Sequence, residues 1–134
     1  MKYFDSDVLI NSLVIQDSKK HKDANDLLES SLKEKNFTVS LLSLQEVSFV
    51  LSKLHYSKDF IIKNLNFYLR NNPLIPDTQI FQRAIELANH IGFSNINDCI
   101  HISVAESYCQ ELITFNRKDF SKLKKYSTIK IIIL

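Results

Sequence analysis

Acidic side chains stand at several points along this 134-residue sequence where predicted strands give way to helices. Asp5 and Asp7 follow a short apolar start, and Asp98 begins a predicted helix. In parallel sheets, ligands collect beyond the carboxyl ends of the strands, so we expect acids placed there to lie close together. The predicted catalytic and metal-binding residues are Asp5, Glu46, Asp98 and Asp119.

The chemistry that such a cluster supports follows from its charge. Several carboxylates in one place raise one another's pKa values and destabilise the fold unless a cation lies among them. All the candidate ligand atoms are oxygens, which suits Mg²⁺ or Mn²⁺ better than zinc or copper. A hard cation of this kind lowers the pKa of a bound water and neutralises charge on a phosphodiester. The acids therefore indicate metal-dependent phosphodiester hydrolysis.

The elements that must position these acids alternate along the chain. We predict strands at residues 2–5, 37–42, 112–115 and 129–133, with a very short one at 74–75. We predict helices at residues 8–14, 19–35, 43–54, 60–69, 78–91 and 97–110. Alternating strands and helices indicate an α/β fold, a three-layer α/β/α sandwich with a mainly parallel central sheet.

Length and composition restrict the class of protein. The chain has no repeat or low-complexity linker, and we expect one domain over residues 1–134. A net charge of +2 and a pI near 8.5 are too mild to identify a nucleic-acid partner. Cys99 and Cys109 lack the spacing of a zinc site, so we expect reduced thiols. Without a signal-peptide pattern or an apolar run of about 20 residues, we predict a cytoplasmic protein and no membrane partner.

Each acid also has an ordinary structural interpretation. Asp5 or Asp7 is a preferred N-cap for the following helix. Ser43 and Glu46 match the S-x-x-E capping box, and Asp98 suits the first turn of a helix. We favour metal binding for Asp5, and we expect Asp7 to orient the turn or to contact the metal through water. For Glu46 alone the capping box is the preferred interpretation, and metal binding is favoured only when the other motifs are considered with it.

Several neighbouring residues keep two interpretations. Asn97 is able to cap the helix that contains Asp98, which would free Asp98 for the metal. Ser6 offers a hydroxyl to the carboxylates or is an ordinary turn residue. A lone helical His such as His101 is more often packed or exposed than catalytic, and we leave it out of catalysis. Two basic runs have two interpretations, as binding sites for RNA phosphates or as solvated faces. One is Lys19, Lys20 and Lys22, and the other is Arg117, Lys118, Lys122, Lys124 and Lys125.

Four short motifs resemble, in order, those of a known family. The segment 5–9, Asp-Ser-Asp-Val-Leu, resembles the opening D-[ST]-[ND]-V-L motif of PIN domains. Residues 40–46 resemble the strand-to-helix segment of that family, which ends in a Glu. Residues 97–101 resemble its Asp-initiated helix, and residues 114–120 are similar to its closing T-x-N-x-x-D-F element. The resemblance covers nearly the whole chain.

The resemblance implies both an activity and a site. A chain of this size is similar to the VapC-type toxins of toxin–antitoxin pairs, which cut RNA and are held inactive by a cognate antitoxin. In that family Asp5, Glu46, Asp98 and a fourth acid would enter the Mg²⁺ or Mn²⁺ site. Many relatives have Asp where Asn116 stands, so the fourth position falls to Asp119 or Asn116. Supporting roles are expected for Ser6, Asp7 and Asn116.

Partners and rival functions complete these expectations. The apolar face of residues 60–69 suggests a homodimer and a groove for an antitoxin helix, with RNA as the substrate. One rival is a receiver-like phospho-acceptor domain that uses Asp5, Asp7, Asp77 and Lys118, but it leaves Glu46 and Asp98 without a role. Another is a PIN-like fold that binds RNA or protein without cutting.

Overall fold

The computed structural model describes all 134 residues, and its strands form one four-stranded sheet. The strands are β1 (Lys2–Phe4), β2 (Phe37–Thr38), β3 (Glu111–Thr114) and β4 (Lys130–Ile133). They lie in the order β2, β1, β3, β4, and every neighbouring pair is parallel. Tyr3 is in register with Thr38 on one side and Leu112 on the other. The chain therefore leaves the two central strands, β1 and β3, at the same edge.

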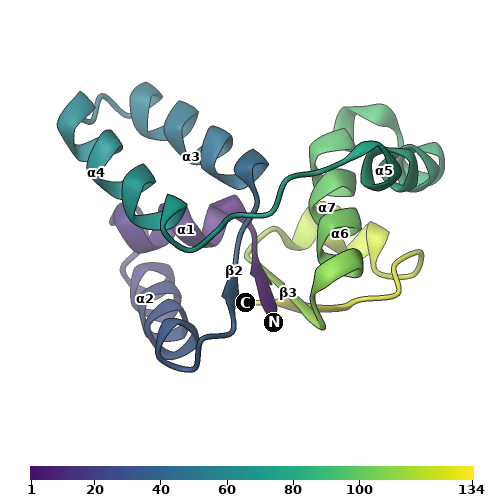
Figure 1. The fold of residues 1–134 in the computed structure, drawn as a ribbon, viewed down its shortest axis with the longest axis horizontal. Helices are drawn as coiled ribbons and strands as arrows, with labels where there is room; N and C mark the ends of the chain where they lie inside the picture. The colour runs from purple at the N-terminus through teal and green to yellow at the C-terminus, as the bar shows by residue number, and fades with distance from the viewer.

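Helices cover both faces of this sheet (Figure 1). They are α1 (Ser6–Leu13), α2 (Ser18–Lys33), α3 (Leu41–Lys53), α4 (Lys58–Leu69), α5 (Thr78–Ile91), α6 (Ile96–Tyr108) and α7 (Arg117–Leu123), with a 3₁₀ turn at Phe93–Asn95. The first four helices lie on one side in Figure 1, and α5, α6 and α7 lie on the other. None of these helices is long and apolar enough to cross a membrane.

Alternation along the strands divides the core into two clusters. Tyr3 and Leu112 point into the cluster formed with α5, α6 and α7, whereas Phe4 and Ile113 point into the cluster formed with α1 to α4. Successive side chains of a strand face opposite sides, so a sheet that is apolar on both faces needs a helical layer on each. The predicted three-layer α/β/α sandwich is confirmed, and its sheet is entirely parallel.

Three local predictions were wrong. The second strand stops at Thr38 rather than residue 42, because the Ser40 side chain caps α3 by accepting a hydrogen bond from the Ser43 amide at 3.2 Å. The helix predicted at 97–110 spans Ile96–Tyr108, with Asn95 at the cap position in place of Asn97. Residues 74–75 form no strand, and Leu74 makes only an isolated bridge to Ser40.

The helix α7 was not predicted at all. Its sequence is a short basic run, which gives little apolar periodicity. It forms because Asn116 caps it and because Phe120 and Leu123 are buried in the core. Its presence matters for the site, since it carries Asp119.

Candidate active site

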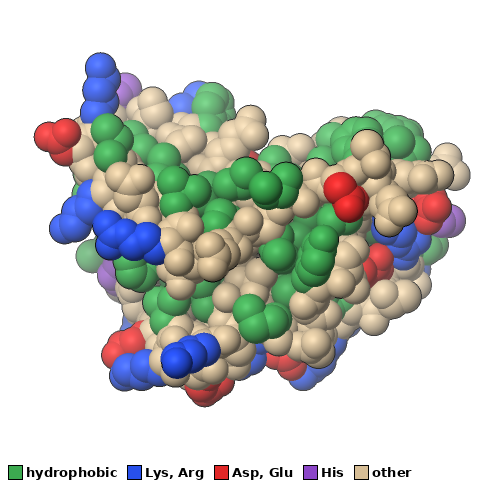
Figure 2. Space-filling view, viewed as in Figure 1, with side chains coloured by type: hydrophobic (Ala, Val, Ile, Leu, Met, Phe, Trp, Pro, Cys, Tyr) green, Lys and Arg blue, Asp and Glu red, His purple; other side chains and the backbone are tan.

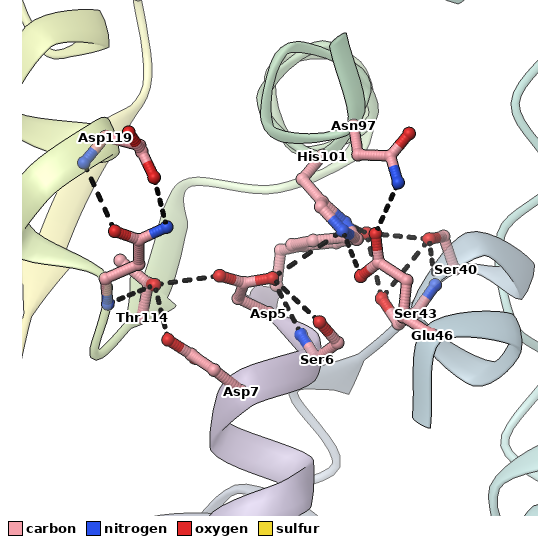
Figure 3. Close-up of polar contacts among 12 residues, drawn as sticks. Asp5, Ser6, Asp7, Ser40, Ser43, Glu46, Asn97, His101, Thr114 and Asp119 are labelled. Carbon is pink, nitrogen blue, oxygen red and sulfur yellow. Dashed lines mark hydrogen bonds and ion pairs between the residues drawn. The ribbon is translucent and has the colours of Figure 1, made fainter. Parts of the chain in front are cut away.

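The acidic residues gather at the carboxyl ends of β1 and β3. Asp5 follows β1 directly, Glu46 lies on α3, and Asp98 lies in the first turn of α6. Figure 3 shows Asp5 between Thr114, the last residue of β3, and His101 with Glu46. Segments far apart in the sequence therefore meet at the sheet edge that the strand-end rule predicts.

Asp5 is held by hydrogen bonds on both carboxylate oxygens. Its Oδ1 atom accepts from the Ser6 amide at 2.7 Å, and its Oδ2 atom accepts from Thr114 Oγ1 at 2.8 Å. The Ser6 hydroxyl lies 3.4 Å from Oδ1. Asp5 is the N-cap of α1 and is only 4% exposed. The two interpretations of Asp5 are thus compatible, because the capping residue also lies inside the acidic cluster.

Asp7 ties α1 to the end of β3. Its Oδ2 atom accepts from the Phe115 amide at 3.0 Å and lies 3.2 Å from Thr114 Oγ1, whose one proton has its shorter contact with Asp5. Burial and the charge of Asp5 raise the pKa of Asp7 to about 7. These contacts agree with the expectation that Asp7 orients the turn.

Glu46 does not form the capping box that its spacing suggested. Because Ser40 caps α3, Glu46 is free to cross to α6. Its Oε2 atom lies 2.8 Å from His101 Nε2, and its Oε1 atom accepts from Asn97 Nδ2 at 3.0 Å. Burial acts to raise the pKa of Glu46, but the hydrogen bond and charge of His101 outweigh it and lower that pKa. The capping-box interpretation is wrong, and Glu46 faces the cluster.

His101 lies inside the acidic cluster, although we expected an ordinary packed or exposed histidine at this position. The ligating atoms of Asp5, Glu46 and His101 all lie within 4.8 Å of one another. His101 is 1% exposed, and its Nε2 atom is 3.6 Å from Asp5 Oδ1. Burial acts to lower the pKa of His101, but Tyr3, Asp5 and Glu46 together hold it well above the usual value. A signal was available, because His101 lies three residues after Asp98 and shares its helix face.

Asp98 is half-buried and lacks any such partner. The side-chain carboxylate of Asp98 accepts no hydrogen bond from the protein, so its pKa is set by burial and by nearby charges. Burial first, and then the negative charge of Asp5, raise the pKa of Asp98 to about 7. The charges of Asp119 and Glu46 act in the same direction, whereas His101 opposes them.

Asp119 approaches the cluster from α7 but is not part of its tight centre. The Asn116 amide donates to Asp119 Oδ2 at 3.0 Å, and Asn116 Oδ1 accepts from the Asp119 backbone amide at 3.2 Å. Asn116 is therefore a helix cap that also orients the Asp119 carboxylate. Asp77, the phospho-acceptor of the receiver alternative, caps α5 through the Ile80 amide at 2.9 Å.

The donor chemistry of the cluster fits a hard divalent cation. Asp5 and Glu46 form a compact group with His101, the potentially cationic side chain, and the charges of Asp5, Glu46 and Asp119 also act on Asp98. Both ring nitrogens of His101 already have partners, namely Tyr3 and Glu46. Burial first, and then the neighbouring carboxylates, raise the pKa of Asp98 although the charge of His101 acts to lower it. Oxygen donors with excess negative charge favour Mg²⁺ or Mn²⁺.

Comparisons with solved structures find similar folds. The fold is similar to a chain of FitAB bound to an IR36 DNA fragment, with a TM-score of 0.72 and 13% identity, covering 99% of this chain and 94% of that chain. It is also similar to a chain of VapBC2 from Rickettsia felis bound to a promoter DNA fragment, with a TM-score of 0.64 and 19% identity, covering 100% and 99%. A search of curated protein sequences found no match.

The family model of the PIN domain matches residues 2–126. That range contains β1, α3, α6, β3 and α7, and so includes every element that brings an acid to the site. Since the match spans most of the chain, this protein belongs to the PIN domain family.

Proposed function

We propose that this protein is a metal-dependent endoribonuclease that hydrolyses RNA phosphodiester bonds at the acidic cluster. The observation that carries the proposal is the grouping of Asp5 and Glu46 within 4.8 Å beside Asp98, whose pKa is raised to about 7 first by burial and then by the charge of Asp5. A carboxylate without hydrogen-bond partners among other acids destabilises the fold unless a cation binds beside it. Strongly shifted groups gathered at a sheet edge are typical of catalytic sites.

Asp5, Glu46 and Asp98 would hold Mg²⁺ or Mn²⁺, directly or through water, and Asp119 would complete the acidic pocket. When bound, the ion supplies an activated water and neutralises charge on the phosphodiester. Thr114 orients Asp5, and Asn97 orients Glu46. Because two carboxylates are fixed before any ligand arrives, the site needs little rearrangement to bind.

Lys20 is our candidate for holding the RNA backbone near the end of β3. Lys20 Nζ lies 5.4 Å from the ring centre of Phe115, which directly follows Thr114. Lys19 and Lys22, by contrast, form ion pairs with Asp23 and Asp26 along α2. We therefore assign phosphate binding to Lys20 and a solvated surface to its two neighbours.

The experiment is cleavage of a mixed RNA substrate by the purified protein, with and without Mg²⁺ or Mn²⁺. Asp5→Asn and Asp98→Asn are compared with Asp77→Asn, a matched control because Asp77, like Asp5, is an N-cap. Metal-dependent cutting should be lost in the first two variants and kept in the third. No cutting by the folded wild-type protein would contradict the proposal and favour a non-cleaving PIN module. A loss confined to Asp77→Asn would place the cleavage activity outside the acidic cluster and would contradict the assignment of the site.

We further propose that the protein is the cytoplasmic toxin of a type II toxin–antitoxin pair, a homodimer inhibited by an antitoxin. Two observations support this: the similar folds in the FitAB and VapBC2 complexes, and apolar side chains exposed on α3 and α4. Phe49 is 61% exposed and Ile62 is 55% exposed, and Figure 2 shows apolar side chains reaching the surface over these helices.

Light scattering should give the mass of a dimer, and a protein encoded beside this one should suppress RNA cleavage when added in purified form. A monomer, or undiminished cleavage, would contradict this part of the proposal.

A further inference from the structure

We propose that Tyr3 and His101 are positioning residues that hold Glu46 in the acidic site and thereby set the affinity of the site for its divalent cation. The inference rests on the proposed function, since it concerns the ion that this function needs. Neither residue touches RNA in this scheme. Both act through Glu46.

A continuous chain of buried and partly buried hydrogen bonds joins the sheet to Glu46. The Tyr3 hydroxyl lies 2.7 Å from His101 Nδ1, and His101 Nε2 lies 2.8 Å from Glu46 Oε2. The same hydroxyl lies 2.7 Å from Ser40 Oγ and 3.1 Å from Ser43 Oγ. The chain therefore connects β1, α3 and α6, three elements that are distant in the sequence (Figure 3).

The direction of these hydrogen bonds is settled at Glu46. A carboxylate is only an acceptor, so His101 Nε2 must carry the proton between them. In a neutral ring, Nδ1 then accepts from the Tyr3 hydroxyl, which in turn accepts from Ser40 or Ser43. In a charged ring, Nε2 still donates to Glu46. Glu46 thus faces a fixed donor in either state of the ring.

The Tyr3 hydroxyl has no explanation in packing alone. Tyr3 is fully buried in the apolar cluster with α5, α6 and α7, where a Phe ring would fill the same space. A buried hydroxyl destabilises the fold unless it is hydrogen-bonded, and here its partners lead to Glu46. Tyr68 offers a contrast, because it is 4% exposed in the other cluster and its hydroxyl lies 3.5 Å from Ser12 Oγ. Tyr68 has no connection to the acids.

The first test measures Mn²⁺ affinity by titration calorimetry in wild type, Tyr3→Phe and Tyr68→Phe. Loss of a group that orients a metal ligand typically weakens metal binding about 10- to 100-fold, and we expect that loss in Tyr3→Phe. Tyr68→Phe removes the hydroxyl of another core tyrosine, one with no connection to the acids, and should bind Mn²⁺ like wild type. Equal Mn²⁺ affinity in all three proteins, each shown to be folded by circular dichroism, would overturn the inference.

Two substitutions of His101 separate its two contacts. His101→Gln places an amide nitrogen near the position of Nε2 and keeps a donor for Glu46, whereas His101→Asn keeps a group near Nδ1 and cannot reach Glu46. His101→Gln keeps the donor to Glu46 but loses the contact to Tyr3, so we expect it to weaken Mn²⁺ binding about as much as Tyr3→Phe, and His101→Asn to weaken it more. The reverse order, or equal loss in both folded variants, would overturn the positioning role.

A readout without metal separates this inference from the proposed function. In the metal-free protein, the His101 Nε2 proton should give a slowly exchanging downfield NMR signal that is lost in Glu46→Ala and shifted in Tyr3→Phe. Absence of this signal in wild type would overturn the inference. If the signal is present but wild type binds no Mn²⁺ or Mg²⁺, the proposed function fails, and with it the role of the two residues in metal affinity.

Discussion

The two sides of the acidic site are built in opposite ways. On one side, all four carboxylate oxygens of Asp5 and Glu46 accept a hydrogen bond, from Ser6, Thr114, Asn97 and His101. On the other side, Asp98 accepts none, and its pKa is raised to about 7. The first two acids contribute to the fold even without a ligand, whereas the charge of Asp98 can be balanced only by something that binds. The site is therefore half preformed and half dependent on its ligand.

The largest effect expected from this difference is on catalysis. Asp98→Asn should lower the rate of metal-dependent RNA cleavage by about 10²- to 10³-fold, because a neutral amide neither attracts the cation nor stabilises the charge that develops. The fold should remain intact. Single-turnover cleavage rates and a thermal melt of the same sample check both expectations, and wild-type rates in the variant would show that Asp98 is outside the catalytic machinery.

The comparison predicts opposite stability effects for two alanine substitutions. Glu46→Ala leaves the buried His101 without its carboxylate partner and should destabilise the protein by about 2–3 kcal/mol. Asp98→Ala removes an unpartnered charge and should leave the metal-free protein as stable as wild type or more stable. Urea unfolding without metal measures both. Equal destabilisation by Glu46→Ala and Asp98→Ala would contradict the difference between the hydrogen-bonded acids and Asp98.

The stability of the metal-free protein should depend on pH through the acids whose pKa values are raised. The pKa values of Asp7 and Asp98 rise from the usual 3.8 to about 7 on folding, so the native state binds protons more tightly than the unfolded state. Stability should therefore be highest near pH 4 and should fall as the pH rises to about 7, after which these two groups contribute no further change. For Asp98 alone we expect the free energy of unfolding to fall by about 1–2 kcal/mol over this pH range.

Unfolding of wild type and Asp98→Asn at several pH values tests this expectation. The variant should lose less stability than wild type between pH 4 and pH 8, and saturating Mn²⁺ should restore the stability of wild type alone. A wild-type curve that rises across this range would contradict the raised pKa values.

The smallest effect concerns the fourth acid. Asn116→Ala removes the cap of α7 and the amide that holds Asp119, and it should destabilise the protein by about 1 kcal/mol. Asn116→Asp keeps the cap and adds a carboxylate where many relatives have one, so Mn²⁺ affinity should rise if that position faces the ion. Calorimetry on both variants decides whether Asp119 or residue 116 completes the site.

Much of this architecture could be predicted because it depends on local patterns. The apolar periods along the chain located the strands and most helices, and the order of elements indicated which residues follow β1 and β3. Asp5, Asp7 and Asp119 were accordingly placed at the correct edge of the sheet. Local patterns failed where two residues offered the same chemistry. Ser40 and Ser43 are both possible caps, and only the position at which the strand leaves the sheet selects Ser40.

Tertiary structure decided which partner each polar group has. By itself the sequence determined the residue types, the parallel α/β order and the presence of acids after the strands. Nothing local distinguishes His101 from an ordinary packed His, because its partners Tyr3 and Glu46 lie 98 and 55 residues away. The physical reason is that hydrogen bonds and charge act over a few ångströms in space, so a pKa or a ligand position depends on contacts that only the folded chain creates.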